Sequence, residues 1–124
     1  MWIKANPNPA KKQVPDCVIR ALCIALKRPW LEVSDDLYAL ARAEFSVSVA
    51  DDIWGQYLAL NGFSQFLLPH DCPRCITIRQ FCRLYNHGIY IIGTGSHAVA
   101  VIDGNYYDSW DSGNEIPTFF WHAV

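Results

Sequence analysis

Three residues far apart in the chain carry the side chains that a cysteine-dependent hydrolase needs. Cys17 begins an apolar run with helical character, and His97 and Asp108 follow near the other end of the chain. A hydrolase of this type uses a thiolate as nucleophile, an imidazole as general base and a carboxylate that orients the imidazole. The order thiol, imidazole, carboxylate therefore predicts a Cys-His-Asp triad.

The spacing of His97 and Asp108 places them on one predicted hairpin. Asp103-Gly104 lies between two alternating segments, which is the strongest local signal for a two-residue turn. Counting outward from this turn predicts the cross-strand pairs Ile102 with Asn105, Val101 with Tyr106, Val99 with Asp108, and His97 with Trp110. His97 and Asp108 are then diagonal neighbours on one face, roughly 7–8 Å apart and within reach of a hydrogen bond.

Two residues beside Asp108 have alternative interpretations. We expect Trp110 to fill core space next to the hairpin, as aromatic residues on an inner strand face usually do. The alternative for Trp110 is that it shields His97 and Asp108 from water. Asp111 is a second carboxylate near His97, but the alternation predicts that it points to the other face.

The predicted helix start favours a reactive thiolate at Cys17. Asp16 is a typical N-cap residue, which leaves Cys17 in the first turn, where backbone N–H groups and the positive helix end stabilise an anion. The same N–H groups would stabilise an oxyanion. Because the Asp16 carboxylate opposes thiolate formation, activation is expected to come mainly from His97 and the helix end. The alternative is that Cys17 is a small buried apolar residue and Asp108 merely caps His97.

Hydrophobic periodicity and turn signals predict helices that precede most of the strands. The expected helices cover about 16–27, 29–45, 49–61 and 77–85, and the expected strands cover 63–68, 89–92 and much of the remaining chain. This order predicts an α+β fold in which N-terminal helices, one of them central and buried, pack on a small antiparallel sheet. The packing would bring Cys17 against the strand that carries His97.

Several stretches together resemble a known family. They are Asn6-Pro7-Asn8-Pro9, Asp16-Cys17-Val18-Ile19-Arg20-Ala21, Trp54-Gly55-x-Tyr57-Leu58, Cys72-Pro73-Arg74-Cys75, His97-Ala98-Val99-Ala100-Val101-Ile102-Asp103-Gly104 and Asp108-Ser109-Trp110-Asp111-Ser112-Gly113. The chain resembles papain-like cysteine peptidases of the bacteriocin-processing type and, more closely, small phage and prophage proteins of that superfamily. The resemblance implies a papain-like fold, with Cys17 as nucleophile, His97 as general base and Asp108 as the orienting residue.

The resemblance also implies a side chain in the oxyanion hole. Those peptidases place a glutamine several residues before the catalytic cysteine. Gln13 lies closer to Cys17 than that pattern expects, and Asn8 is the other candidate donor.

The residues and the resemblance together predict a cysteine hydrolase that cleaves a peptide or isopeptide bond of a peptide or protein substrate. The reaction would pass through an acyl-enzyme at Cys17 and would require no cofactor. One alternative is an amidase, deamidase or acyl-transferase with the same triad. Another is a phage-encoded binding module that keeps the papain-like fold without turnover.

A second group of residues has the ligand types of a structural zinc site. Cys72-Pro73-Arg74-Cys75 is followed by Cys82 and His87, which together supply a possible tetrahedral set. The alternatives are a redox-active pair or thiols that are simply buried or exposed. With five cysteines, an odd number, and a reducing compartment expected, the sequence predicts no disulfide framework.

Length and composition limit the class of protein. The 124 residues predict a single domain, 1–124, and the 52% hydrophobic content predicts a well-formed core. A formal charge of −2 offers no basic surface for nucleic acid. The beginning of the chain lacks the apolar segment of a signal peptide, and no apolar run is long enough to span a membrane. We therefore expect no nucleic-acid or membrane partner and a cytoplasmic location, which the resemblance to phage and prophage proteins implies to be that of a bacterial host.

Overall fold

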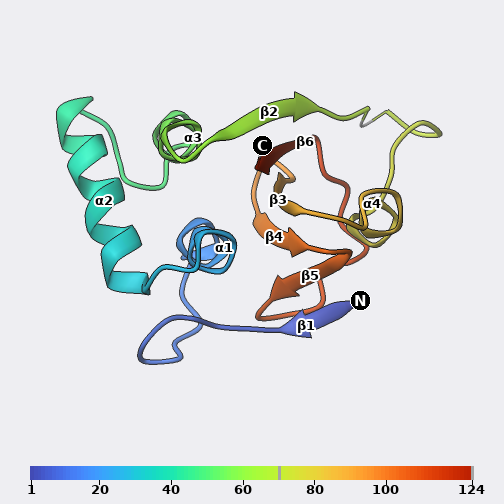
Figure 1. Ribbon diagram of the computed structural model, residues 1–124, viewed down its shortest axis with the longest axis horizontal. Helices are drawn as coiled ribbons and strands as arrows, with labels where there is room; N and C mark the ends of the chain where they lie inside the picture. Colours follow the sequence, from blue (N-terminus) through green and yellow to red (C-terminus); the bar gives the residue numbers. More distant parts are fainter. Residues whose placement is uncertain (70, 124) are drawn as a thin grey trace.

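The computed structural model describes residues 1–69 and 71–123 (Figure 1). These residues contain four helices and six strands. The helices are α1 (Cys17–Leu26), α2 (Trp30–Ala43), α3 (Asp51–Leu60) and α4 (Ile78–Leu84). The strands are β1 (Trp2–Lys4), β2 (Phe63–Leu67), β3 (Ile89–Gly93), β4 (Ala98–Ile102), β5 (Asn105–Asp108) and β6 (Phe119–Ala123). The predicted α+β class is confirmed. None of the helices among these residues has the length and apolar character needed to cross a bilayer.

All six strands form one mixed sheet in the order β1-β5-β4-β3-β6-β2. The neighbouring strands are antiparallel except for β1 and β5, which are parallel. The predicted antiparallel sheet is therefore found in every neighbouring pair except one, and the parallel pairing of β1 with β5 makes the sheet mixed. β1 has only three residues, too few for alternation to reveal a strand, and its pairing with β5 joins segments about a hundred residues apart.

The apolar helix α1 lies between the sheet on one side and α2 and α3 on the other (Figure 1). Six of its ten residues are buried: Ile19, Arg20, Ala21, Leu22, Cys23 and Ala25. The apolar ones among them share a core cluster with Ala98 and Ala100 of β4, whose small side chains permit close approach of helix and sheet. This packing places the beginning of α1 next to the residues that precede β4.

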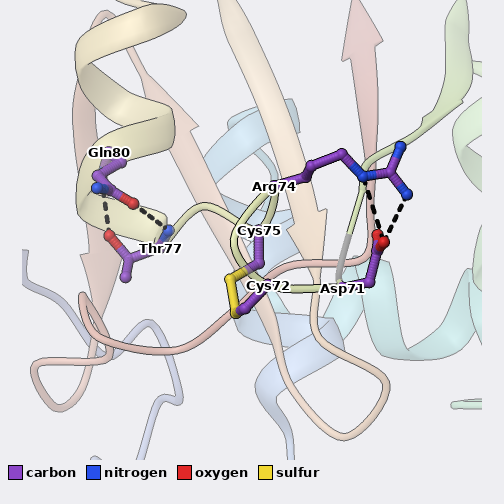
Figure 2. Close-up of a disulfide and its surroundings, with 6 residues drawn as sticks. All are labelled: Asp71, Cys72, Arg74, Cys75, Thr77 and Gln80. Atoms are coloured by element: carbon purple, nitrogen blue, oxygen red, sulfur yellow. Dashed lines mark hydrogen bonds and ion pairs between the residues drawn. A yellow bond between two sulfur atoms is a disulfide. The ribbon is translucent and has the colours of Figure 1, made fainter.

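The other face of the sheet is covered by α4 (Figure 1). Phe81 of α4 packs against Tyr90 of β3 and Phe120 of β6 in a second core cluster. A capping box lies at the start of α4, with the Gln80 N–H donating to Thr77 Oγ1 and the Thr77 N–H donating to Gln80 Oε1 (Figure 2).

The hairpin between β4 and β5 has the predicted turn. Asp103 and Gly104 have φ values of 49° and 80°, as the favoured two-residue hairpin turn requires. The predicted pairs Ile102 with Asn105 and Val101 with Tyr106 are confirmed.

The hairpin differs from the prediction at its open end. The ladder between β4 and β5 extends to Ala100 and Tyr107, while His97 and Trp110 lie outside both strands. The chain turns just before β4, where the Thr94 N–H donates to the His97 carbonyl. His97 is therefore a turn residue at the sheet end rather than a ladder residue.

A close approach between β3 and β6 makes Gly93 a sensitive position. A Cβ atom at Gly93 would lie 2.3 to 2.8 Å from ring atoms of Phe119, its partner on β6. Gly93→Ala is therefore expected to lower the free energy of unfolding by about 1–3 kcal/mol through overpacking. Urea denaturation measures this change. Ser64→Ala on exposed β2 serves as the control, and equal stability of the two variants would contradict the expected clash.

Candidate active site

Cys17 is the first residue of α1 and is half-buried at the edge of a cavity. Asp16 occupies the N-cap position, but its side chain accepts no hydrogen bond from the first turn of the helix. The expectation that the Asp16 side chain caps α1 is therefore wrong, because the carboxylate is bound by Arg20 and Trp30 instead. The first-turn N–H groups consequently keep their capacity to bind an anion beside the thiol.

Cys17 and His97 lie at the wall of the same cavity, and the pKa of each is shifted by the other. Burial raises the pKa of the Cys17 thiol, but the interaction with His97, the backbone N–H of Ala98 and the positive charges of His97 and Arg20 outweigh it. The net result is a lowered pKa, so the site favours a thiolate paired with an imidazolium.

His97 contacts Asp108 on its other side, as the hairpin spacing predicted. The distance from His97 Nε2 to Asp108 Oδ2 is 2.6 Å, which leaves Nδ1 as the ring nitrogen for Cys17. Burial lowers the pKa of His97, but its bonds with Asp108 and Cys17 and their negative charges raise it to about 9. Burial raises the pKa of Asp108, but hydrogen bonds from His97 and Ser112 bring it below its ordinary value. The imidazolium and the carboxylate therefore stabilise each other.

Asp108 is held in place by residues that the sequence analysis did not assign. The Ser112 hydroxyl donates to Oδ2 at 2.6 Å, and the Ser109 N–H donates to Oδ1 at 2.8 Å. The Asp108 carbonyl accepts from the Ala5 N–H at 2.9 Å and from Trp2 Nε1 at 3.1 Å. The unpredicted strand β1 and the segment that follows it thus fix the backbone at Asp108.

Arg20 is a further residue of the site that the sequence analysis missed. Its buried guanidinium pairs with Asp16 and lies 3.7 Å from Asp108 Oδ1, and both carboxylates are also buried. A buried cation between two buried anions offsets their desolvation and repulsion. The signal in the sequence was the single charged side chain within the apolar run of α1.

Trp110 covers the imidazole from the solvent side. Its ring centroid is 5.0 Å from that of His97, and the side chain is 45% exposed. The core interpretation of Trp110 is therefore wrong, because its side chain is exposed to solvent beyond the end of β5. Asp111 accepts a hydrogen bond from the Tyr106 hydroxyl and pairs with Arg79 of α4.

The cavity beside Cys17 has a volume of about 250 Å³ and opens to solvent. Its lining consists of Pro15, Cys17, Val18, Val49, Asp51, Trp54, Gly95, Ser96, His97, Ala98 and Phe119. Most of the wall is apolar, and Asp51 contributes a carboxylate from the start of α3. A substrate in this cavity would meet the thiol and the imidazole together.

Neither predicted oxyanion side chain lines the cavity. Gln13 is exposed in the segment before α1. Asn8 is buried, its amide nitrogen donates to Asp16 Oδ2 at 3.3 Å, and its oxygen accepts from the Ala10 N–H. The structure therefore gives Asn8 a supporting contact with Asp16 and places neither predicted side chain at the cavity.

The structure does not bring the four predicted zinc ligands together. Cys72 and Cys75 form a disulfide in the loop before α4, beside the Asp71–Arg74 ion pair (Figure 2). Cys82 is a buried residue of α4, and His87 is exposed in the turn before β3. Within the described residues, no group of three or more His, Cys, Asp or Glu side chains is arranged to hold a metal ion.

The disulfide also corrects the expectation drawn from the odd number of cysteines. The Cα atoms of Cys72 and Cys75 are 4.7 Å apart, a separation that a disulfide spans. Cys17, Cys23 and Cys82 are free thiols. An odd number of cysteines is therefore compatible with one disulfide between two cysteines close together in the sequence.

No protein-family model, curated protein or solved structure matches this chain. Its activity must therefore be inferred from the contacts around Cys17 and from the cavity beside it.

Proposed function

We propose that the protein is a small papain-like cysteine hydrolase that cleaves a peptide or isopeptide bond through an acyl-enzyme at Cys17. The observation that carries the proposal is that Cys17 and His97 share the wall of a solvent-open cavity while His97 is hydrogen-bonded to Asp108 at 2.6 Å. The pKa of the thiol is lowered and that of the imidazole is raised, as a thiolate–imidazolium pair requires. A structural cysteine has no need of this pairing.

The reaction would proceed by two acyl transfers. The Cys17 thiolate attacks the carbonyl carbon, and the N–H groups at the start of α1 stabilise the oxyanion. The His97 imidazolium gives its proton to the departing amine as the carbon–nitrogen bond breaks, which leaves a thioester at Cys17. Neutral His97 then takes a proton from water, whose oxygen attacks the thioester. Release of the carboxylic acid restores the thiolate and the imidazolium.

The proposal predicts a bell-shaped dependence of kcat/KM on pH. The rate should rise as pH increases through the lowered pKa of Cys17, because only the thiolate attacks the substrate. It should fall above the His97 pKa of about 9, because a neutral imidazole cannot protonate the departing amine. A rate that keeps rising through the ordinary thiol pKa of about 8.5 would contradict this assignment.

A screen against quenched fluorescent peptides, isopeptides and glutamine-containing peptides tests the activity. Mass spectrometry should find cleaved peptides with the native protein and none with Cys17→Ala, and it should detect an acyl adduct on Cys17. Release of ammonia from glutamine without cleavage would assign the triad to deamidation. If Cys17 reacts rapidly with small electrophiles but nothing is turned over, a binding module becomes the better account.

A further inference from the structure

A second, more open cavity of about 470 Å³ lies next to the cavity at Cys17. The second cavity is lined by Asp51, Asp52, Gly55, Gln56, Ala59, Gln65 and Trp121, so the two cavities share Asp51. The two neighbouring cavities follow α3 from Cys17 to Trp121, and we call them together the Asp51 groove. A groove that extends beyond the reacting thiol suits an extended polypeptide better than a small amide.

Apart from Cys17 and His97, the charged side chains that line the Asp51 groove are all negative. Asp51 and Asp52 begin α3, and no lysine or arginine lines either cavity in the described part of the chain. The thiolate of Cys17 and the imidazolium of His97 cancel each other's charge. Trp54 Nε1 donates to Asp51 Oδ1 at 3.0 Å and so fixes the carboxylate at the junction of the two cavities. The groove is therefore electrostatically complementary to a cation.

Aromatic walls accompany this carboxylate. The rings of Trp54 and Phe119 are 5.8 Å apart in the catalytic cavity. Trp121 lies against Gly55, where an added Cβ would be 3.2 Å from the indole ring. Lysine and arginine side chains have apolar stems that pack on aromatic surfaces and cationic ends that pair with carboxylates.

We propose that the substrate is an extended polypeptide with a lysine or arginine side chain beside the scissile bond, and that Asp51 is the residue that selects it. This inference rests on the proposed hydrolase function and names the substrate class of the same site. The basic side chain lies along the aromatic wall, and its cation pairs with Asp51. Asp52 adds negative charge at the outer part of the groove.

Charged thiol reagents test the inference without a known substrate. The Cys17 thiolate attacks a methanethiosulfonate, which forms a mixed disulfide and releases methanesulfinate. The probes are a trimethylammonium reagent, a sulfonate reagent and the neutral methyl reagent, each normalised to its rate with glutathione. At low salt, we expect the cationic reagent to label Cys17 roughly fivefold faster, relative to the neutral one, than the anionic reagent.

Matched variants assign the charge preference to Asp51. The preference should fall severalfold in Asp51→Asn and should be unchanged in Asp35→Asn, which removes an exposed carboxylate of α2 outside both cavities. Rapid neutral labelling of Cys17 without a charge preference, or a preference retained in Asp51→Asn, overturns the inference and leaves the hydrolase proposal intact. Failure of Cys17 to react with the neutral reagent contradicts the hydrolase proposal itself.

Cleavage assays provide a second measurement of the same selectivity. For any peptide that the native protein cleaves, replacing the basic residue nearest the cleaved bond with norleucine should lower kcat/KM at least about fivefold. Asp51→Asn should remove most of the difference between the two peptides. Equal cleavage of both peptides by the native protein contradicts the inference.

Discussion

Arg20→Gln is expected to lower the free energy of unfolding by about 3–5 kcal/mol, as measured by urea denaturation. The substitution leaves Asp16 and Asp108 buried without the cation that lies between them. Arg42→Gln, an exposed change in the last turn of α2, is the matched control and should change stability by less than about 0.5 kcal/mol.

A double variant tests whether the loss of stability in Arg20→Gln comes from the buried carboxylates that are left without a cation. Asp16→Asn combined with Arg20→Gln removes one of the two uncompensated carboxylates, so it should recover at least about 1 kcal/mol relative to additivity. Simple addition of the two single effects would show that Arg20 contributes by packing alone. An Arg20→Gln protein as stable as the native one would contradict the assigned ion pairs.

Asp108→Asn is expected to lower kcat/KM by a factor on the order of 10³–10⁴, as loss of the orienting carboxylate does in serine hydrolases. Asparagine keeps the size of the side chain but removes the negative charge that raises the pKa of His97. Without that charge, the imidazolium is less stable and the thiolate loses its partner. The titration of His97 by NMR should shift from about 9 toward its ordinary value.

Asp111→Asn provides the control for that experiment. Asp111 is three residues further along and binds Tyr106 and Arg79 rather than His97. It should leave the His97 titration and the kcat/KM nearly unchanged. Equal losses in the two variants would contradict the assignment of Asp108 as the orienting residue.

The parts of the site that sequence predicted are those fixed by local chemistry. The apolar run beginning at Cys17 specified a central helix, because an all-round apolar helix must be buried. The Asp103-Gly104 turn specified the hairpin register, because few residues adopt two successive positive φ values. These two signals were sufficient to predict the contact between His97 and Asp108.

The parts that sequence did not predict depend on contacts between distant segments. Nothing in Trp2–Lys4 indicates that this segment adds a parallel strand to β5. Asp16 has the residue type of a helix cap, but Arg20, Trp30 and Asn8 compete successfully for its carboxylate. The charge of Arg20 within α1 was visible, but its two carboxylate partners are defined only by the packing of α1 on the sheet.

The most direct test is the pH profile of iodoacetamide labelling, assigned to each cysteine by mass spectrometry in the native protein and in His97→Ala. Burial raises the pKa of Cys23 to about 11 and also raises that of Cys82, so these thiols should react slowly. We expect Cys17 to be labelled selectively well below the ordinary thiol pKa of about 8.5, and His97→Ala to slow that reaction roughly tenfold or more. Slow labelling of Cys17, or labelling that is unaffected by His97→Ala, would contradict the assignment of Cys17 as an activated nucleophile.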